Sequence, residues 1–215
     1  MLTNIVVKGV FRMNRKDPRV TRTLYRLDQS LLENLKSCDF RKITVEMLCT
    51  KAKVNRSTFY KYYKDKCELL DSYLNRILKE FDEATTITGF VLASPYTISD
   101  EDYIQSFRRT ITFIFDRREI YRILWNAAVC RPIYQEMEDI ICRNVLNTLQ
   151  PQDNSGNAVP VTPYHELYAR LFASNLMTLA KWWLINEPVI TLSDVESVMK
   201  GNMKAGLFVT FKEPE

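Results

Sequence analysis

Glycine and proline are scarce in this chain, with 5 glycines and 8 prolines among 215 residues. Because these two residues interrupt regular structure, long uninterrupted elements are expected between them. The intervening stretches are rich in Leu, Ile, Arg, Lys and Glu, most of which are good helix formers. The sequence therefore predicts an all-α protein.

Apolar side chains recur at helical spacing near the N-terminus. Asp17 and Pro18 form a typical N-cap and first helical position. They are followed, at intervals of three or four residues, by Val20, Leu24, Leu27, Leu31 and Leu35. A second and shorter helix can start at Thr44, with an inner stripe formed by Val45, Leu48, Cys49 and Ala52. A third can start at Asn55.

Charge is unevenly distributed along the chain. Residues 1 to 66 hold 16 Lys and Arg against 6 Asp and Glu, a net charge of +10, whereas the remainder has a net charge of −6. A basic segment of this kind suits a module that binds a polyanion, because basic side chains near phosphates release counterions. A solvated basic surface is the alternative, and charge alone does not separate the two.

The third helix crowds aromatic and basic residues together in "VNRSTFYKYYKDKCELL", residues 54 to 70. At about 100° per residue, one side holds Phe59, Tyr62 and Tyr63, of which Phe59 and Tyr63 can pack on the first two helices. The other side holds residues that can reach base edges and phosphates: Arg56, Ser57, Tyr60 and Lys61. Two short helices joined by a tight turn, with such a face on the second, predict a helix-turn-helix DNA reader at residues 44 to 63.

A fourth helix is expected to start at Asp65, which forms a capping-box-like pair with Glu68. The free amides there, beside Lys66, would suit a phosphate. This helix would run to residue 81, with an inner stripe of Leu70, Leu74, Ile77 and Phe81.

The segment "ITVEMLCTKAKVNRSTFYKYYKDKCELL" resembles, position by position, the N-terminal DNA-binding region of the TetR/AcrR family of transcriptional regulators. The shared features are a Thr-capped helix, an Ala-x-Val turn, a Thr-Phe-Tyr core and a Lys before a Leu-Leu pair, and the resemblance covers residues 18 to 70. It implies a three-helix DNA-binding domain at residues 14 to 66. A helical bundle for ligand binding and dimerisation would follow at residues 67 to 215.

Carried over by position, the resemblance implies that Thr44 contacts a phosphate, and that Tyr60 and Lys66 clamp phosphates on either side of the groove. Three further residues would face bases. The full predicted DNA-binding set is Thr44, Asn55, Arg56, Ser57, Thr58, Tyr60, Lys61, Tyr62 and Lys66.

Two positions depart from the family pattern. Lys53 stands where many members have glycine, so a lysine must bear any positive φ in the turn. Tyr63 replaces a commoner phenylalanine, so its hydroxyl needs a protein partner or a water molecule.

Further helices are expected at residues 100 to 118, 118 to 128, 132 to 149, 163 to 187 and 194 to 211, with a loop at residues 150 to 162. Ser193 and Glu196 predict a capping box before the last helix. The last two helices carry small residues on long apolar faces: Ala169, Ala173, Ala180, Gly201 and Ala205, beside Leu176, Leu184, Met203 and Leu207. The resemblance implies that these two helices form a homodimer interface, and an internal core is the alternative. "KWWLIN" also resembles a Firmicutes-type subgroup of the family.

Aromatic residues are abundant in the middle helices. They mark a candidate pocket for a small-molecule effector, lined by Phe107, Tyr121, Trp125, Tyr134, Tyr168 and Phe172. The same spacing is typical of core packing, which is the alternative.

The sequence argues against an enzyme and against a cofactor or metal. His165 is the only histidine, and it has no glycine-flanked serine, phosphate-binding glycine loop or paired carboxylates to accompany it. Five cysteines without paired spacing predict free thiols in a reducing compartment.

The N-terminal segment "IVVKGVF" is too short and too charged for a signal sequence, no apolar run is long enough for a membrane span, and Met13 is an alternative start to Met1. We therefore expect a cytoplasmic transcriptional regulator, a ligand-responsive repressor that binds a palindromic double-stranded operator as a homodimer. The alternative is a helical adaptor or coactivator that acts through a protein partner.

Overall fold

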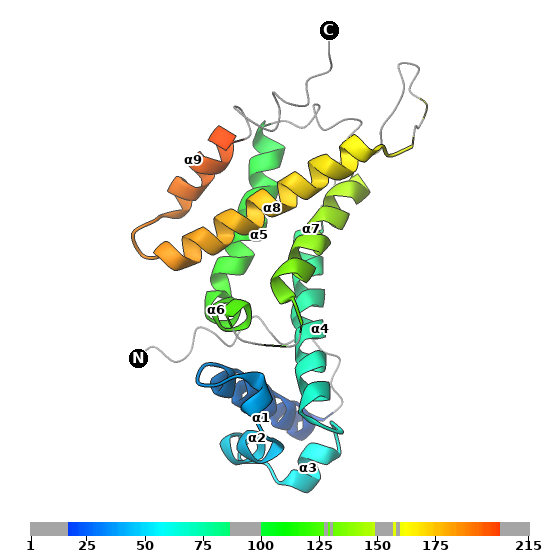
Figure 1. The fold of residues 1–215 in the computed structure, drawn as a ribbon, viewed down its shortest axis with the longest axis vertical. Coiled ribbons are helices and arrows are strands. Elements are labelled where there is room, and N and C mark those ends of the chain that lie inside the picture. The colour runs from blue at the N-terminus through cyan, green and yellow to red at the C-terminus, as the bar shows by residue number, and fades with distance from the viewer. Residues whose placement is uncertain are drawn as a thin grey trace. The chain divides into compact units, whose positions relative to one another are not determined.

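The computed structural model describes residues 17–86, 100–126, 129, 131–148, 157 and 160–202. Within these ranges the regular structure is helical and contains no strand, as the composition predicts (Figure 1). The chain divides into two compact units, which are described one at a time. The alternative start at Met13, the thiol of Cys130, and Met203, Ala205 and Leu207 lie outside the described residues.

The first unit contains α1 (Pro18–Leu35), the 3-10 helix η1 (Phe40–Lys42), α2 (Val45–Ala52), α3 (Arg56–Tyr60), most of α4 (Lys66–Thr85) and α6 (Arg118–Asn126). α1 begins as predicted, because Asp17 Oδ1 accepts the Arg19 N–H at 2.8 Å. Its inner stripe is also confirmed, with Leu27, Leu31 and Leu35 buried. α1 packs closely on α2, where Ser30 Oγ donates to the Leu48 carbonyl at 2.8 Å. In Figure 1, α1, α2 and α3 gather beside the first turns of α4.

The second unit contains the end of α4, α5 (Asp100–Asp116), nearly all of α7 (Ile133–Thr148), α8 (Pro163–Asn186) and α9 (Leu192–Asn202). Asn144 on α7 donates to Asp82 and to Thr85 in the last turn of α4, at 3.0 and 3.1 Å. Phe115 of α5 stacks on Trp183 of α8, with 4.1 Å between ring centroids. Phe81 of α4 lies beside Phe113 of α5, with 6.1 Å between ring centroids, so the four helices share one apolar core.

The alanines of α8 lie inside this core. Ala169, Ala173 and Ala180 are all 0% exposed, and Leu176 and Leu184 between and beyond them are buried as well. The alternative of an internal core therefore holds for this face of α8. The apolar side chains that α8 exposes, such as Leu167 and Ile185, lie outside this buried set.

α9 starts two residues earlier than the sequence predicts. Thr191 and Asp194 form its capping pair, since Asp194 Oδ2 accepts the Thr191 N–H at 2.8 Å and the Asp194 N–H donates back to Thr191 Oγ1 at 3.3 Å. The predicted Ser193–Glu196 box is wrong, because the Glu196 carboxylate binds Arg108 of α5 at 2.5 and 2.9 Å. Thr191–Asp194 and Ser193–Glu196 both have the three-residue spacing of a capping box. Glu196 is drawn away from the second pair because Arg108 lies close to its carboxylate.

His165 takes part in the start of α8. Its Nδ1 accepts the Thr162 N–H at 3.1 Å, so the imidazole satisfies an amide just before the helix. No helix among the described residues is long and apolar enough to cross a membrane.

Candidate nucleic-acid interface

α2 begins at a threonine cap, as predicted. Thr44 has an extended backbone, and its Oγ1 accepts the Met47 N–H at 3.2 Å. The residue is exposed, at the corner where the sequence resemblance implies a phosphate contact. The cap is confirmed, and the phosphate contact stays a prediction.

The turn between α2 and α3 is left-handed at Lys53, which has φ 54° and ψ 49°. The Val54 N–H donates to the Cys49 carbonyl at 3.0 Å, five residues back, as in a Schellman ending. The expectation that a lysine bears a positive φ here is confirmed. The turn is tight enough to bring α3 directly after α2.

α3 has a buried side and an exposed side, as the helical period predicts. Phe59 is 0% exposed and lies 5.8 Å from the ring of Tyr63, which is also buried. The opposite side is exposed and presents Arg56, Ser57, Tyr60 and Lys61. Thr58 and Tyr62 are half-buried at its edges. α3 is short, and Asn55 takes the N-cap position without a side-chain capping bond.

Exposed cations surround this face. Around η1, α2 and α3, the exposed basic residues are Arg41, Lys42, Lys51, Lys53, Lys61 and Lys64. They provide the positive charge that a phosphate backbone would require.

Arg56 is paired with a carboxylate that sequence reasoning missed. Its Nη2 lies 3.1 Å from Glu46 Oε2, in the first turn of α2. Both side chains remain mostly exposed. Glu46 is an acidic residue within the basic segment, and it could have suggested a pair. The two residues are ten positions apart and lie on different helices, so helical spacing does not bring them together.

Lys66 is placed differently from the other predicted DNA-binding residues. Its ammonium donates to the carbonyls of Phe40, Arg41 and Ile43, at 2.9, 2.9 and 2.6 Å. The side chain is half-buried, whereas Thr44, Arg56 and Lys61 are exposed. The phosphate contact of Lys66 stays a prediction.

Comparisons with known proteins point to one fold. No family model matches the chain. An uncharacterised HTH-type transcriptional regulator from Bacillus subtilis (strain 168), YxbF, is 22% identical over 129 residues, which are 57% of this chain and 32% of that protein. The chain thus spans about a third of the length of this relative.

Solved structures cover more of the chain. A TetR-family transcriptional regulator from Haemophilus influenzae superposes with a TM-score of 0.54 at 17% identity, over 88% of this chain and 98% of that one. The dihydroxyacetone kinase operon activator DhaS gives 0.50 at 13% identity, over 87% and 95%. The fold is that of TetR-family regulators.

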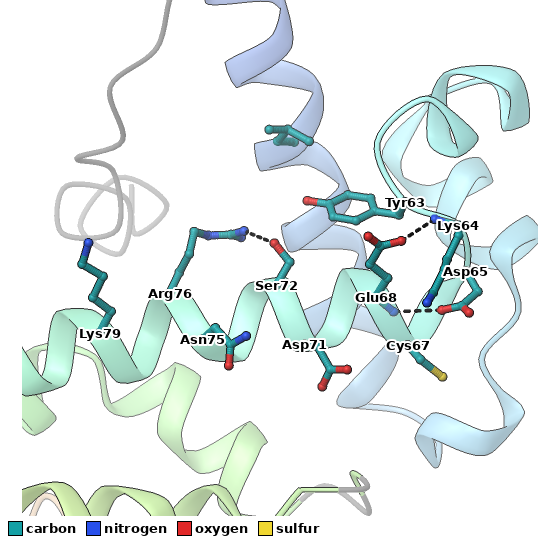
Figure 2. Close-up of a pocket in the computed structure, with 11 residues that line it drawn as sticks. Tyr63, Lys64, Asp65, Cys67, Glu68, Asp71, Ser72, Asn75, Arg76 and Lys79 are labelled. Carbon is teal, nitrogen blue, oxygen red and sulfur yellow. Dashed lines mark hydrogen bonds between the residues drawn. The ribbon is translucent and has the colours of Figure 1, made fainter.

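In this TetR fold, the hydroxyl of Tyr63 lies near Ser72 and Arg76 of α4 (Figure 2). Arg76 in turn donates to Asp28 of α1 at 2.5 Å, and both of these charged side chains are largely buried. Burial, followed by the Asp28 charge, raises the pKa of Tyr63. The Arg76–Asp28 pair joins α4 to α1.

A groove of about 690 Å³ lies along the start of α4, between Leu24 of α1 and Lys79. Figure 2 shows three hydrogen bonds among its lining residues: Glu68 accepts the Lys64 backbone N–H, Asp65 accepts the Glu68 backbone N–H, and Arg76 donates to Ser72. The capping pair predicted for Asp65 and Glu68 is therefore only partly confirmed, since Glu68 reaches Lys64 instead of Asp65. None of the predicted effector residues lines the groove.

The predicted effector residues are divided between the units. Tyr121 stacks on Trp125 in the first unit, with 5.4 Å between centroids, and the other four lie in the second. Four are buried, namely Phe107, Tyr121, Tyr168 and Phe172. This burial fits the core-packing alternative, and an effector role stays a prediction. Among the described residues, no group of three or more metal-ligating side chains is found.

Proposed function

We propose that this protein is a cytoplasmic transcriptional regulator that binds double-stranded DNA by placing α3 in the major groove. The observation that carries the proposal is the two-sided α3, whose Phe59 is fully buried while Arg56, Ser57 and Lys61 are exposed. A recognition helix needs both features, because its inner face must fix its position while its outer face reads bases.

In this proposal the exposed side chains have separate roles. Arg56, Ser57 and Lys61 contact base edges, where guanidinium, hydroxyl and ammonium donors can distinguish base pairs. Thr44 and Tyr60 contact phosphates, which set the register of the protein on the duplex. The flanking contacts come from Asn55, Thr58 and Tyr62.

We further propose that the regulator is a homodimer assembled through α8. Its exposed apolar residues share one side of the helix, here called the α8 stripe, in two groups: Tyr164, Leu167 and Leu171 near the start, and Trp182 and Ile185 near the end. The polar Ser174 and Thr178 lie between the two groups. Burial of this α8 stripe against a second copy would remove a large apolar surface from water. Two copies would present two α3 helices to half-sites about 34 Å apart, so the operator would be palindromic.

The dimer would repress transcription by occupying its operator. A small-molecule effector bound among Phe107, Tyr134, Tyr168 and Phe172 would favour a separation of the two readers that no longer fits DNA. To shift the population from 99:1 to 1:99, the effector must bind one state more tightly than the other by about 5.5 kcal/mol. Activation is the second candidate, because one solved protein of this fold, DhaS, is named an operon activator.

The test is selection of bound fragments from random duplex DNA by the purified protein, at two salt concentrations. We expect an enriched two-fold-symmetric site whose affinity falls as salt rises. A selection that yields no enriched sequence at either salt concentration would contradict the proposal and favour an adaptor that acts through a protein partner.

A further inference from the structure

We infer that Lys66 acts as a positioning residue that holds the start of α2 in place for DNA, and that it does not contact a phosphate. The inference rests on the proposed DNA-binding function. It concerns how that function is achieved, and it departs from the role that the sequence resemblance implies.

The hydrogen bonds of the Lys66 ammonium leave no donor for DNA. A lysine ammonium has three hydrogens, and three carbonyl oxygens lie within 2.6 to 2.9 Å of the nitrogen, those of Phe40, Arg41 and Ile43. The charge also lies 4.9 Å from the centroid of the Phe40 ring. A phosphate contact would break this set of bonds and leave the carbonyls to find other donors.

The location of Lys66 explains why these bonds form. Lys66 is the first residue of α4, where the helix dipole disfavours a positive charge. η1 ends at Lys42, and the carbonyls at the end of a helix carry partial negative charge. The ammonium therefore finds at the end of η1 the negative potential that its own helix lacks.

The same bonds act on the reader through Thr44. Ile43, whose carbonyl makes the shortest bond with Lys66, immediately precedes the Thr44 cap of α2. Phe40 and Ile43 are 2% and 1% exposed, so the segment is also fixed by its own side chains. Lys66 thus ties α4 to the residue before the cap and orders the first turn of α2 before DNA arrives. Such preorganisation raises affinity without a direct contact.

The salt dependence of binding separates the two roles. A lysine that neutralises a phosphate contributes about 0.9 to the slope of log affinity against log salt. We would measure affinity for the selected operator at several salt concentrations with the wild type, Lys66→Met and Lys66→Arg. Lys200→Met, which removes an exposed lysine of α9, is the matched control for net charge.

We expect Lys66→Met to weaken binding on the order of tenfold, as loss of charge-assisted hydrogen bonds would, with the slope of the wild type. Lys66→Arg should weaken binding as well, because a planar guanidinium cannot direct its hydrogens to three converging carbonyls. A slope less negative by about 0.9 in Lys66→Met, or wild-type affinity in Lys66→Arg, would overturn the inference.

A second experiment uses the protein without DNA. Hydrogen exchange of the free full-length protein should become faster at residues 41 to 48 in Lys66→Met, while the buried turns of α1 exchange as in the wild type. Unchanged exchange at residues 41 to 48 would overturn the positioning role. If the wild type shows no salt-dependent duplex binding, the proposed function fails, and this experiment still decides whether Lys66 orders the segment.

Discussion

Lys53 ends α2 in a backbone conformation that glycine adopts freely. For a residue with a Cβ, the left-handed region costs about 1 to 2 kcal/mol, whereas a glycine adds about 0.4 to 1 kcal/mol of chain entropy to the unfolded state. The first cost is the larger, so Lys53→Gly should stabilise the first unit by up to about 1 kcal/mol. Urea unfolding would measure the gain.

Lys51→Gly is the control for Lys53→Gly. Lys51 lies in the last turn of α2, where a glycine should cost about 1 kcal/mol. Destabilisation by both substitutions would mean that the turn does not need a left-handed residue.

Glu46 places a negative charge on the surface that would face phosphates. Glu46→Gln should raise affinity for duplex DNA of any sequence by a few fold at low salt, because one repulsive charge is removed and Arg56 is released. It should also reduce discrimination among operator variants, since Arg56 loses a fixed orientation. Fluorescence anisotropy with operator and scrambled duplexes would show both effects. Glu33→Gln, which breaks a similar exposed pair with Lys36 on α1, should change neither.

The sequence alone predicted which side chains of α3 point into the core and which point outward. It placed Phe59 inward and Arg56 and Lys61 outward, because their positions depend only on rotation about one helix axis. It could not foresee the carbonyls around Lys66, which lie 23 to 26 residues earlier in the chain. Contacts of this kind depend on how separate helices pack, and no local pattern encodes that.

At the scale of elements, α9 is joined to α5 by an ion pair that acid should break. The hydrogen bond from Arg108 lowers the pKa of Glu196 from its usual value of 4.5. A carboxylate with a depressed folded pKa stabilises the protein above its unfolded pKa, and this stabilisation disappears as pH falls through the folded pKa. We therefore expect Glu196→Gln to be less stable than the wild type at pH 7, by less than about 1 kcal/mol because Arg108 is partly exposed.

The difference should shrink below about pH 4.5 and vanish once the wild-type carboxyl is protonated. Thermal unfolding of both proteins between pH 7 and pH 3 would follow it. Glu33→Gln, which removes an exposed carboxylate in the second half of α1, should change stability by less than about 0.5 kcal/mol at any pH. A pH-independent difference for Glu196→Gln would show that charge is not what joins α9 to α5.

Local patterns predicted where most helices lie, but not every boundary or face. α9 offered two overlapping capping pairs, and the choice between Asp194 and Glu196 depended on Arg108, 88 residues away. The alanines of α8 fitted an interface inside the chain as well as one between chains, because periodicity shows that a face is buried without showing what buries it.

For the whole molecule, the α8 stripe predicts its assembly. Leu171→Glu would place a charge in the middle of the proposed dimer interface and should weaken dimerisation at least tenfold, an effect of about 1.4 kcal/mol or more. The fold of each chain should be unaffected, since Leu171 is 39% exposed in the single chain. Sedimentation equilibrium would give the dissociation constant.

Val189→Glu is the control for Leu171→Glu, because Val189 is 82% exposed and lies beyond the end of α8. It should remain as dimeric as the wild type. Equal dimerisation of Leu171→Glu and the wild type would rule out this face as the interface.

The pairing of distant helices could be learned only from the structure. α6 packs with α1 in the first unit, although more than 80 residues separate them along the chain. The domain division near residue 66 stays a prediction, because apolar spacing identifies helices without identifying their neighbours.

The capping role of His165 has a practical consequence for spectroscopy. A chain with one histidine gives a single pair of imidazole carbon-bound proton signals in an NMR spectrum. Those signals would report on the first turn of α8, next to Tyr164 at the end of the α8 stripe. Association of two copies could therefore be followed on the unmodified protein, with no added label.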